Sequence, residues 1–97
     1  MNMELDGMFS TRDIYLAATL ICLHFYVANI DYQVEGKSPR PVGYFQFEAT
    51  PELQKAEKAF WQGKLAVEPR QFVTNFRGLY SQVNDKYKSP YSKFNTK

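Results

Sequence analysis

Cys22 and His24 are the residues whose types and spacing come nearest to a site of chemistry, because a Cys-x-His pair can ligate a transition metal. A structural zinc ion needs four such ligands, and this chain has 1 Cys and 1 His in total. Both residues also lie in the most apolar stretch of the chain, residues 14–30. A contact between His24 and a partner stays open, but we expect both side chains to be buried and to serve packing.

The other common signatures of catalysis do not occur in the sequence. Its 5 Gly residues are isolated from one another, and none precedes the Lys-Ser/Thr pair of a phosphate-binding loop. The carboxylates are scattered, without the spacing of a divalent-metal loop. Since catalysis needs several polar or titratable groups in one pocket, we expect a protein that is not an enzyme, with no catalytic residue, no metal and no cofactor.

The composition predicts one small folded domain. Of the 97 residues 44% are hydrophobic and 16% are aromatic, which is too apolar for a disordered chain. Each aromatic ring buries roughly 150–250 Å², so a few rings can close a small core. The single Cys cannot form an internal disulfide, and no secretory signal is recognisable, so we expect a cytoplasmic protein. The apolar stretch is too short for a membrane span, which needs about 20 apolar residues.

The net charge of +2 hides an uneven distribution. Residues 1–35 carry 1 basic and 5 acidic residues, whereas residues 36–97 carry 11 and 5. A basic half can favour nucleic acid or an acidic protein surface, although a shift of this size is also common in proteins that bind neither.

The first predicted helix has the clearest start signal. Ser10 and Asp13 have the spacing of a capping box, in which the Ser10 hydroxyl accepts from the Asp13 amide. With Ser10 as N-cap, Phe9 and Ile14 fall on the two positions of a hydrophobic staple, so both signals give the same register. We therefore expect a helix over residues 11–23.

Two strands are predicted next. Apolar and polar residues alternate over residues 30–35 and again over residues 43–48. The segment 36–41 between them contains Gly and two Pro residues and therefore predicts a turn. The two strands should form an antiparallel hairpin with a basic tip that carries Lys37 and Arg40.

Two more helices should follow the hairpin. Thr50 as N-cap and Pro51 at the first helical position begin a short helix, and Gly63 stands at its predicted C′ position. Pro69 then begins a helix whose apolar residues recur with a period of 3.6 as far as Val83.

The remaining segment, residues 84–97, carries lysines and no apolar period. This composition predicts an extended tail that becomes ordered only on contact with a partner. The predicted organisation is an N-terminal lead over residues 1–8, an α+β domain over residues 9–84 and a basic, aromatic-containing tail over residues 85–97. The domain has the element order α-β-β-α-α, a two-stranded antiparallel hairpin packed on three helices. An isolated hairpin is marginally stable, which leaves homodimerisation through the hairpin edge as an open alternative.

One family resemblance spans residues 9–84. The chain carries F-S-T-x-D-I-x-L-A-A-x-L from residue 9, F-x-F from residue 45, and F-x-x-G-x-x-x-V-x-P-x-x-F-x-x-x-x-R-x-L-x-S from residue 60. This succession is similar to a family of small domains of unknown function found in bacterial, archaeal and phage genomes. The shared positions are cap, core and turn positions, so the resemblance implies a fold and no chemistry. Its distribution among phages and mobile elements implies an accessory role.

The first functional hypothesis is a noncatalytic accessory protein of phage or mobile-element type that binds a protein or ribonucleoprotein partner. This hypothesis is based on a domain that is rich in aromatic residues and has no recognisable catalytic residues. The expected contacts are aromatic side chains, namely Tyr44, Trp61, Tyr87, Tyr91 and Phe94.

The alternative hypothesis is a nucleic-acid-binding module. Opposite its apolar stripe, the helix that begins at Pro69 carries Arg, Asn and Gln, whose donors match base edges and phosphates. The tail interleaves lysines with aromatic residues, which suits single-stranded nucleic acid. A solvated helix face and a solubilising tail are the plainer interpretations of the same residues. The expected contacts are basic side chains, namely Lys37, Arg40, Arg70, Arg77, Lys86, Lys88 and Lys93.

Overall fold

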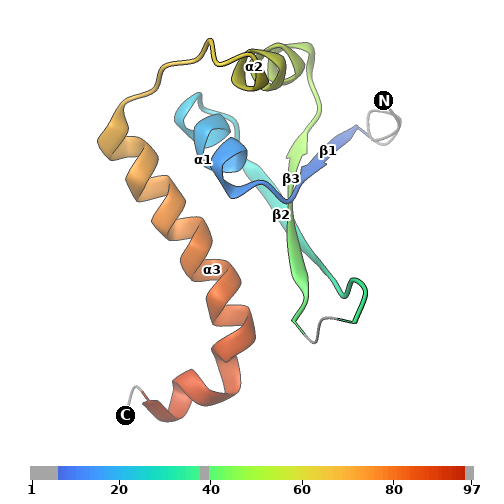
Figure 1. Cartoon of the computed structure of the whole chain (residues 1–97), viewed down its shortest axis with the longest axis vertical. Helices are drawn as coiled ribbons and strands as arrows, with labels where there is room; N and C mark the ends of the chain where they lie inside the picture. Colours follow the sequence, from blue (N-terminus) through green and yellow to red (C-terminus); the bar gives the residue numbers. More distant parts are fainter. Residues whose placement is uncertain (1–6, 38–39, 96–97) are drawn as a thin grey trace.

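The computed structural model describes residues 7–37 and 40–95, with side chains described as far as Asn84. Over these residues three strands and three helices follow one another, so the predicted α+β class is confirmed (Figure 1). Their order along the chain is β1 (Met8–Thr11), α1 (Ile14–Cys22), β2 (Val27–Gln33), β3 (Val42–Glu48), α2 (Pro51–Trp61) and α3 (Pro69–Asn95).

The sheet has the strand order β1-β3-β2, and both pairs are antiparallel. Phe47 of β3 lies opposite Phe9 on one side and Val27 on the other. The predicted two-stranded hairpin is therefore wrong in detail, because β1 pairs with the side of β3 that was expected to be free. Of the two hairpin strands, β3 is paired on both sides, and only β2 has an unpaired side within the described residues. A bulge between Val27 and Asn29 interrupts the pairing of β2 with β3.

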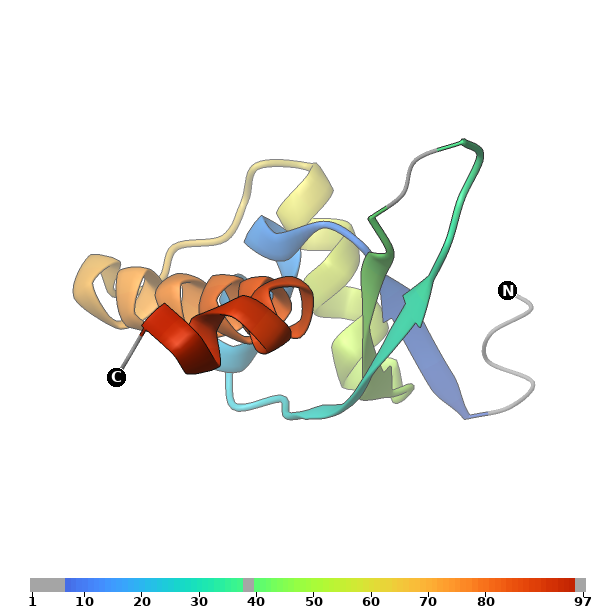
Figure 2. The ribbon, with the colours of Figure 1, turned by 90° about the horizontal axis from the view of Figure 1, so that it is seen from below.

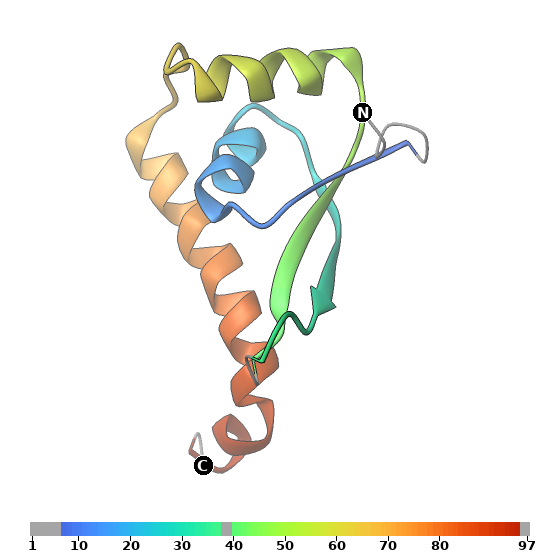
Figure 3. The same ribbon diagram turned by 45° about the vertical axis from the view of Figure 1, so that its right-hand side comes forward.

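One face of the sheet is covered by helices. α1 and α3 lie on this side, and α2 lies across the end of the sheet where β3 stops (Figure 2, Figure 3). The residues of the core come from all these layers and are Phe9, Leu16, Ala17, Ala18, Leu20, Phe45, Phe47, Leu53 and Leu79. A fully buried Leu or Phe contributes about 1.5–3 kcal/mol through removal of apolar surface from water, so this cluster supplies most of the stability.

The opposite face of the sheet is polar. Asn29 and Gln46 are cross-strand neighbours there, and the Asn29 Nδ2 donates to Gln46 Oε1 at 3.2 Å. Further along β2, Gln33 Nε2 donates to Asp31 Oδ2 at 2.6 Å. Gln46 lies between the buried rings of Phe45 and Phe47 along β3, as the alternation over residues 43–48 predicted.

The start of α1 corrects the predicted capping box. Asp13 is the N-cap, and its Oδ1 accepts from the backbone N–H of Tyr15 at 2.9 Å and of Leu16 at 3.1 Å. Ser10 lies three residues earlier, inside β1. The helix begins later than expected because Thr11 is held in the sheet opposite Phe45, and strand pairing outweighs the local capping signal.

The end of α1 corrects the prediction for His24. This residue is exposed and has φ of 76°, in the left-handed region. The N–H of His24 donates to the Ile21 carbonyl at 2.9 Å, and the N–H of Phe25 donates to the Leu20 carbonyl at 3.0 Å. These two bonds form a Schellman motif, so His24 occupies the C′ position that glycine normally takes. The apolar run of the sequence concealed this helix end.

Both ends of α2 confirm the prediction. The Thr50 hydroxyl accepts from the Leu53 N–H at 3.1 Å, and Pro51 follows at the first helical position. At the other end Gly63 has φ of 70°, and the Lys64 N–H donates to the Ala59 carbonyl at 2.9 Å. Each signal here involves residues close in sequence.

α3 is longer than predicted. The expected extended tail is wrong over residues 85–95, where the backbone stays helical. The helix changes direction in its last part, drawn in red in Figure 1 and Figure 3, and the sequence of this helix contains Pro90. A proline inside a helix lacks the N–H donor and is a common cause of a bend. No helix among the described residues combines the length and the apolarity needed to cross a bilayer.

Exchange of Asp13 for alanine tests the observed cap against the predicted one. Asp13→Ala should lower the free energy of unfolding by about 1 kcal/mol because two backbone N–H groups lose their acceptor. Ser10→Ala should change it by less than about 0.5 kcal/mol, since this residue has no capping role. Thermal and urea unfolding of both variants measure the difference, and equal losses would contradict the assignment.

Exchange of His24 for glycine should stabilise the protein. The left-handed conformation costs an ordinary L-residue roughly 1–2 kcal/mol, and glycine avoids this cost. Glycine also loses more conformational entropy on folding, which reduces the gain by about 0.5–1 kcal/mol. The expected gain is therefore about 0.5–1 kcal/mol in the free energy of unfolding. His24→Ala is the control, because alanine keeps the strain and should give no gain.

Candidate functional site

Cys22 and His24 do not form a site together. Cys22 is half-buried, and its Sγ accepts from Asn75 Nδ2 of α3 at 3.3 Å. His24 lies beyond the end of α1 and is exposed to solvent. Within the described part of the chain no three His, Cys, Asp or Glu residues come together in a group that could hold a metal ion.

Asn75 was expected on the solvated polar face of α3, and the structure corrects this. Besides its contact with Cys22, the Asn75 amide donates to the Ala18 carbonyl at 3.4 Å. Its Oδ1 accepts from Gln71 Nε2 at 3.2 Å. Asn75 therefore fastens α3 to α1, and its side chain is engaged within the fold.

A row of stacked rings lies across α1 and α3. Its centre is Phe76, whose ring centroid lies 5.4 Å from Tyr15, 6.3 Å from Phe72 and 6.0 Å from Tyr80. We call these four residues the aromatic strip. Its two phenylalanines are half-buried, whereas Tyr15 and Tyr80 are 57% and 56% exposed. The strip thus presents two tyrosine rings to solvent on an apolar base.

A hollow of about 270 Å³ adjoins the aromatic strip at Tyr80. Its other lining residues come from the β1–α1 turn, from the start of α1, from β3 and from α3, and they are Arg12, Ile14, Val42, Gly43, Phe45 and Val83. Gly43 has a steric role here, because a Cβ at this position would lie 3.2 Å from Ile30 Cγ2 and 3.5 Å from Val83 Cγ2. The tight contact is the one with Ile30 of β2, so a side chain at this position would press on the neighbouring strand, whereas its contact with Val83 of α3 would be ordinary.

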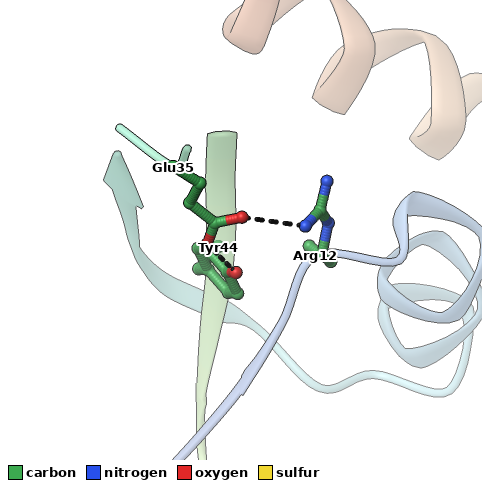
Figure 4. A network of polar contacts seen from close by, with 3 residues as sticks. All are labelled: Arg12, Glu35 and Tyr44. Atoms are coloured by element: carbon green, nitrogen blue, oxygen red, sulfur yellow. Dashed lines mark hydrogen bonds and ion pairs between the residues drawn. The ribbon is translucent and has the colours of Figure 1, made fainter. Parts of the chain in front are cut away.

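Three polar residues brace the sheet beside the hollow (Figure 4). The Glu35 carboxylate accepts from Arg12 Nη1 at 3.0 Å and also from the Tyr44 hydroxyl. Arg12 follows β1, Glu35 follows β2 and Tyr44 belongs to β3, so the carboxylate ties three segments together. The bond that the Tyr44 hydroxyl donates to Glu35 is the main cause that raises the pKa of Tyr44 above its ordinary value of 10.0.

The aromatic residues expected to bind a partner are not gathered by the described structure. Tyr44 is half-buried and engaged with Glu35. Trp61 lies at the end of α2, is 59% exposed, and donates from Nε1 to Glu57 at 3.0 Å. The remaining members of the set have side chains outside the part of the chain that the structure describes, namely Tyr87, Tyr91 and Phe94.

The basic residues expected to bind nucleic acid are also dispersed. Lys37 and Arg40 are exposed at the hairpin tip, whereas Arg70 is exposed at the start of α3, at the other end of the molecule (Figure 1). The Nε of Arg70 lies 4.0 Å from a carboxylate oxygen of Glu68. Arg77 is exposed on the middle of α3. The lysines of the tail have side chains outside the described residues, namely Lys86, Lys88 and Lys93.

The sequence interpretation missed Tyr15 and Tyr80 as surface residues. Phe72, Phe76 and Tyr80 belong to the apolar period predicted for the helix that begins at Pro69, and this period predicts that all three face the core. The signal that could have separated them is the residue type, because a tyrosine at the margin of a stripe often keeps its hydroxyl end in water.

Comparison of the chain with family models, with curated proteins and with solved structures finds no match. The family resemblance therefore stays a prediction that rests on the quoted residues.

The raised pKa of Tyr44 predicts a loss of stability at alkaline pH. Its folded pKa exceeds the unfolded value, so the contribution of the neutral hydroxyl is fully present below about pH 10 and is lost as the pH rises through the folded pKa. Tyr44→Phe should remove this dependence. Urea unfolding of both proteins from neutral to strongly alkaline pH measures it.

Glu35→Gln supplies the control for this titration. The neutral amide can still accept from the tyrosine but no longer disfavours its anion, so the pKa of Tyr44 should move down toward 10.0. Ultraviolet difference titration against Tyr44→Phe isolates this one phenol. An unchanged midpoint in Glu35→Gln would contradict the role of the carboxylate.

Proposed function

We propose that this protein is a noncatalytic accessory module that binds a protein partner through the aromatic strip. The observation that carries the proposal is the exposure of Tyr15 and Tyr80, two rings stacked on half-buried phenylalanines. Tyrosine is enriched at protein interfaces because its ring has a large apolar area and its hydroxyl can bond a partner or water.

The geometry of the aromatic strip favours tight contact. Phe72, Phe76 and Tyr80 follow one another at intervals of four residues on α3, and Tyr15 is fixed close to the capped start of α1. Because helical packing already restricts these rings, a partner would immobilise few additional rotamers on binding. Exposed rings held in this way commonly dominate the binding free energy of an interface.

The adjoining hollow adds a place for a partner side chain. Ile14, Val42 and Val83 line it together with Arg12, whose guanidinium is bonded to Glu35. An apolar side chain of a partner would bury surface against the three aliphatic residues. A mixture of apolar and polar contacts is typical of protein interfaces.

The accessory character and the phage or mobile-element setting come from the family resemblance alone. A ribonucleoprotein partner would fit the same proposal, because its protein component could contact the aromatic strip.

Binding of nucleic acid is the second candidate, supported by the exposed Arg70 and Arg77 on α3. The distance between the start of α3 and the hairpin tip weakens it, since phosphate contacts gain most when basic residues follow one groove or stripe. Its signature would be an affinity that falls linearly with salt on a log–log plot.

Capture of partners by immobilised variants tests the proposal. Tyr15→Ala and Tyr80→Ala should each weaken retention of a specific protein roughly tenfold, and the double variant should abolish it, because the exposed part of the strip is removed. Nuclease-treated extract of the source cells provides the partners, and mass spectrometry with quantitative binding of the recovered protein measures retention.

Trp61→Ala provides the comparison, because Trp61 is an exposed ring of α2 that belongs to the contacts expected from the sequence but not to the aromatic strip. It should retain the partner as the unmodified protein does. Equal retention by the double variant would exclude the aromatic strip as the binding surface. Retention of nucleic acid instead, with a steep dependence on salt, would favour the second candidate.

A further inference from the structure

We propose that a second cleft, at the opposite end of α1 from Tyr15, accepts the positively charged side chain of an arginine or lysine from a protein partner. This inference rests on the proposed function as a protein-binding module. It assigns to that module the chemistry of one partner residue.

The cleft has a volume of about 410 Å³ and lies where α1 ends, β2 begins, β3 ends and α2 begins. The residues that line it are His24, Phe25, Tyr26, Ala28, Phe47, Glu48, Thr50 and Glu52. Phe47 is fully buried and Phe25 is half-buried, so these rings give the cleft an apolar base. Such a base suits the methylene groups of a long basic side chain.

The charges of the cleft are of one sign. Glu48 and Glu52 are both exposed, and neither has an ion pair or a hydrogen bond from its side chain among the described residues. No lysine or arginine occurs among the described residues that line the cleft. The ends of α1 and α2 contribute opposite partial charges of about half a unit each, which offset one another. Within the part of the chain that the structure describes, the two carboxylates therefore have no neutralising partner.

Tyr26 supplies an open ring at the same place. Its side chain is 79% exposed, next to His24 and Ala28 in the lining of the cleft. A guanidinium or ammonium group placed over the face of a tyrosine is attracted by the ring quadrupole, and Tyr26 lines the same cleft as Glu48 and Glu52. A carboxylate-bearing partner would be repelled, and an apolar partner would bury both glutamates without compensation. Complementarity of charge therefore favours a basic partner residue in the cleft.

Two short peptides test the inference. Acetyl-Gly-Arg-Gly-amide and the same peptide with citrulline differ in charge but hardly in shape, and each is titrated into the isotope-labelled full chain at low salt with NMR detection. The arginine peptide should shift the amide signals of residues 24–28 and 47–52 saturably, and the citrulline peptide should bind at least fivefold more weakly. Equal binding of both peptides, or no saturable shift at the cleft up to about 10 mM peptide, would overturn the proposal.

Matched variants locate the charge. The double variant Glu48→Gln with Glu52→Gln should bind the arginine peptide at least fivefold more weakly, and Tyr26→Ala should weaken it about twofold to fivefold. Glu57→Gln removes one carboxylate charge from α2 outside the cleft and should bind as the unmodified protein does. The amide spectrum and the melting temperature of each variant show whether it is folded. Unchanged binding by the folded double variant would refute the assignment.

These outcomes are independent of the test of the aromatic strip. Retention of a partner through Tyr15 and Tyr80 without binding of the arginine peptide would support the proposed function and refute the assignment of the cleft. Binding of the arginine peptide without retention of any protein would refute the proposed function.

Discussion

Burial of Phe45 and Phe47 on the central strand is the constraint on which the rest of the structure depends. β3 has a paired strand on each side, and α1 covers its inner face. Alternate residues of a strand point to opposite faces, so these two rings determine which face of the sheet meets the helices. A shift of one residue in register would turn Tyr44 and Gln46 toward the core. The contact of Tyr44 with Glu35 would then be lost together with the packing of α1.

The parts of the fold that the sequence predicts correctly are those with local signals. Thr50 and Gly63 begin and terminate α2 through bonds between near neighbours. Alternation of residue types predicts the antiparallel pairing of β2 with β3, although β2 begins at Val27 and ends at Gln33 and the prediction was residues 30–35. β1 could not be recognised because its pairing partner lies about 40 residues away, opposite Met8 at Glu48. The same short segment also fits a helix cap, and only the long-range pairing decides between the two readings. The helical backbone beyond Asn84 could not be predicted because the sequence there has no apolar period.

The candidate surfaces were less predictable than the fold. A period of 3.6 residues identifies the stripe that contains Phe72 and Phe76, but it does not reveal how far the neighbouring helix covers that stripe. Tyr15 is exposed because it lies outside the buried face of α1, which Leu16, Ala17, Ala18 and Leu20 form. The cleft near Tyr26 is formed by the ends of two helices and two strands, which meet only in the folded protein. No single segment of the sequence therefore predicts it.

The bulge between Val27 and Asn29 has a consequence for solubility. An outer strand with an uninterrupted row of free backbone groups is a template for edge-to-edge growth into fibres, and natural sheets blunt such edges by local irregularities. Here the bulge confines the regular part of β2 to Asn29–Gln33, opposite Gln46–Val42. An incoming chain would find a register that breaks off after a few residues, so growth of ordered aggregates along this edge is disfavoured while the sheet stays folded.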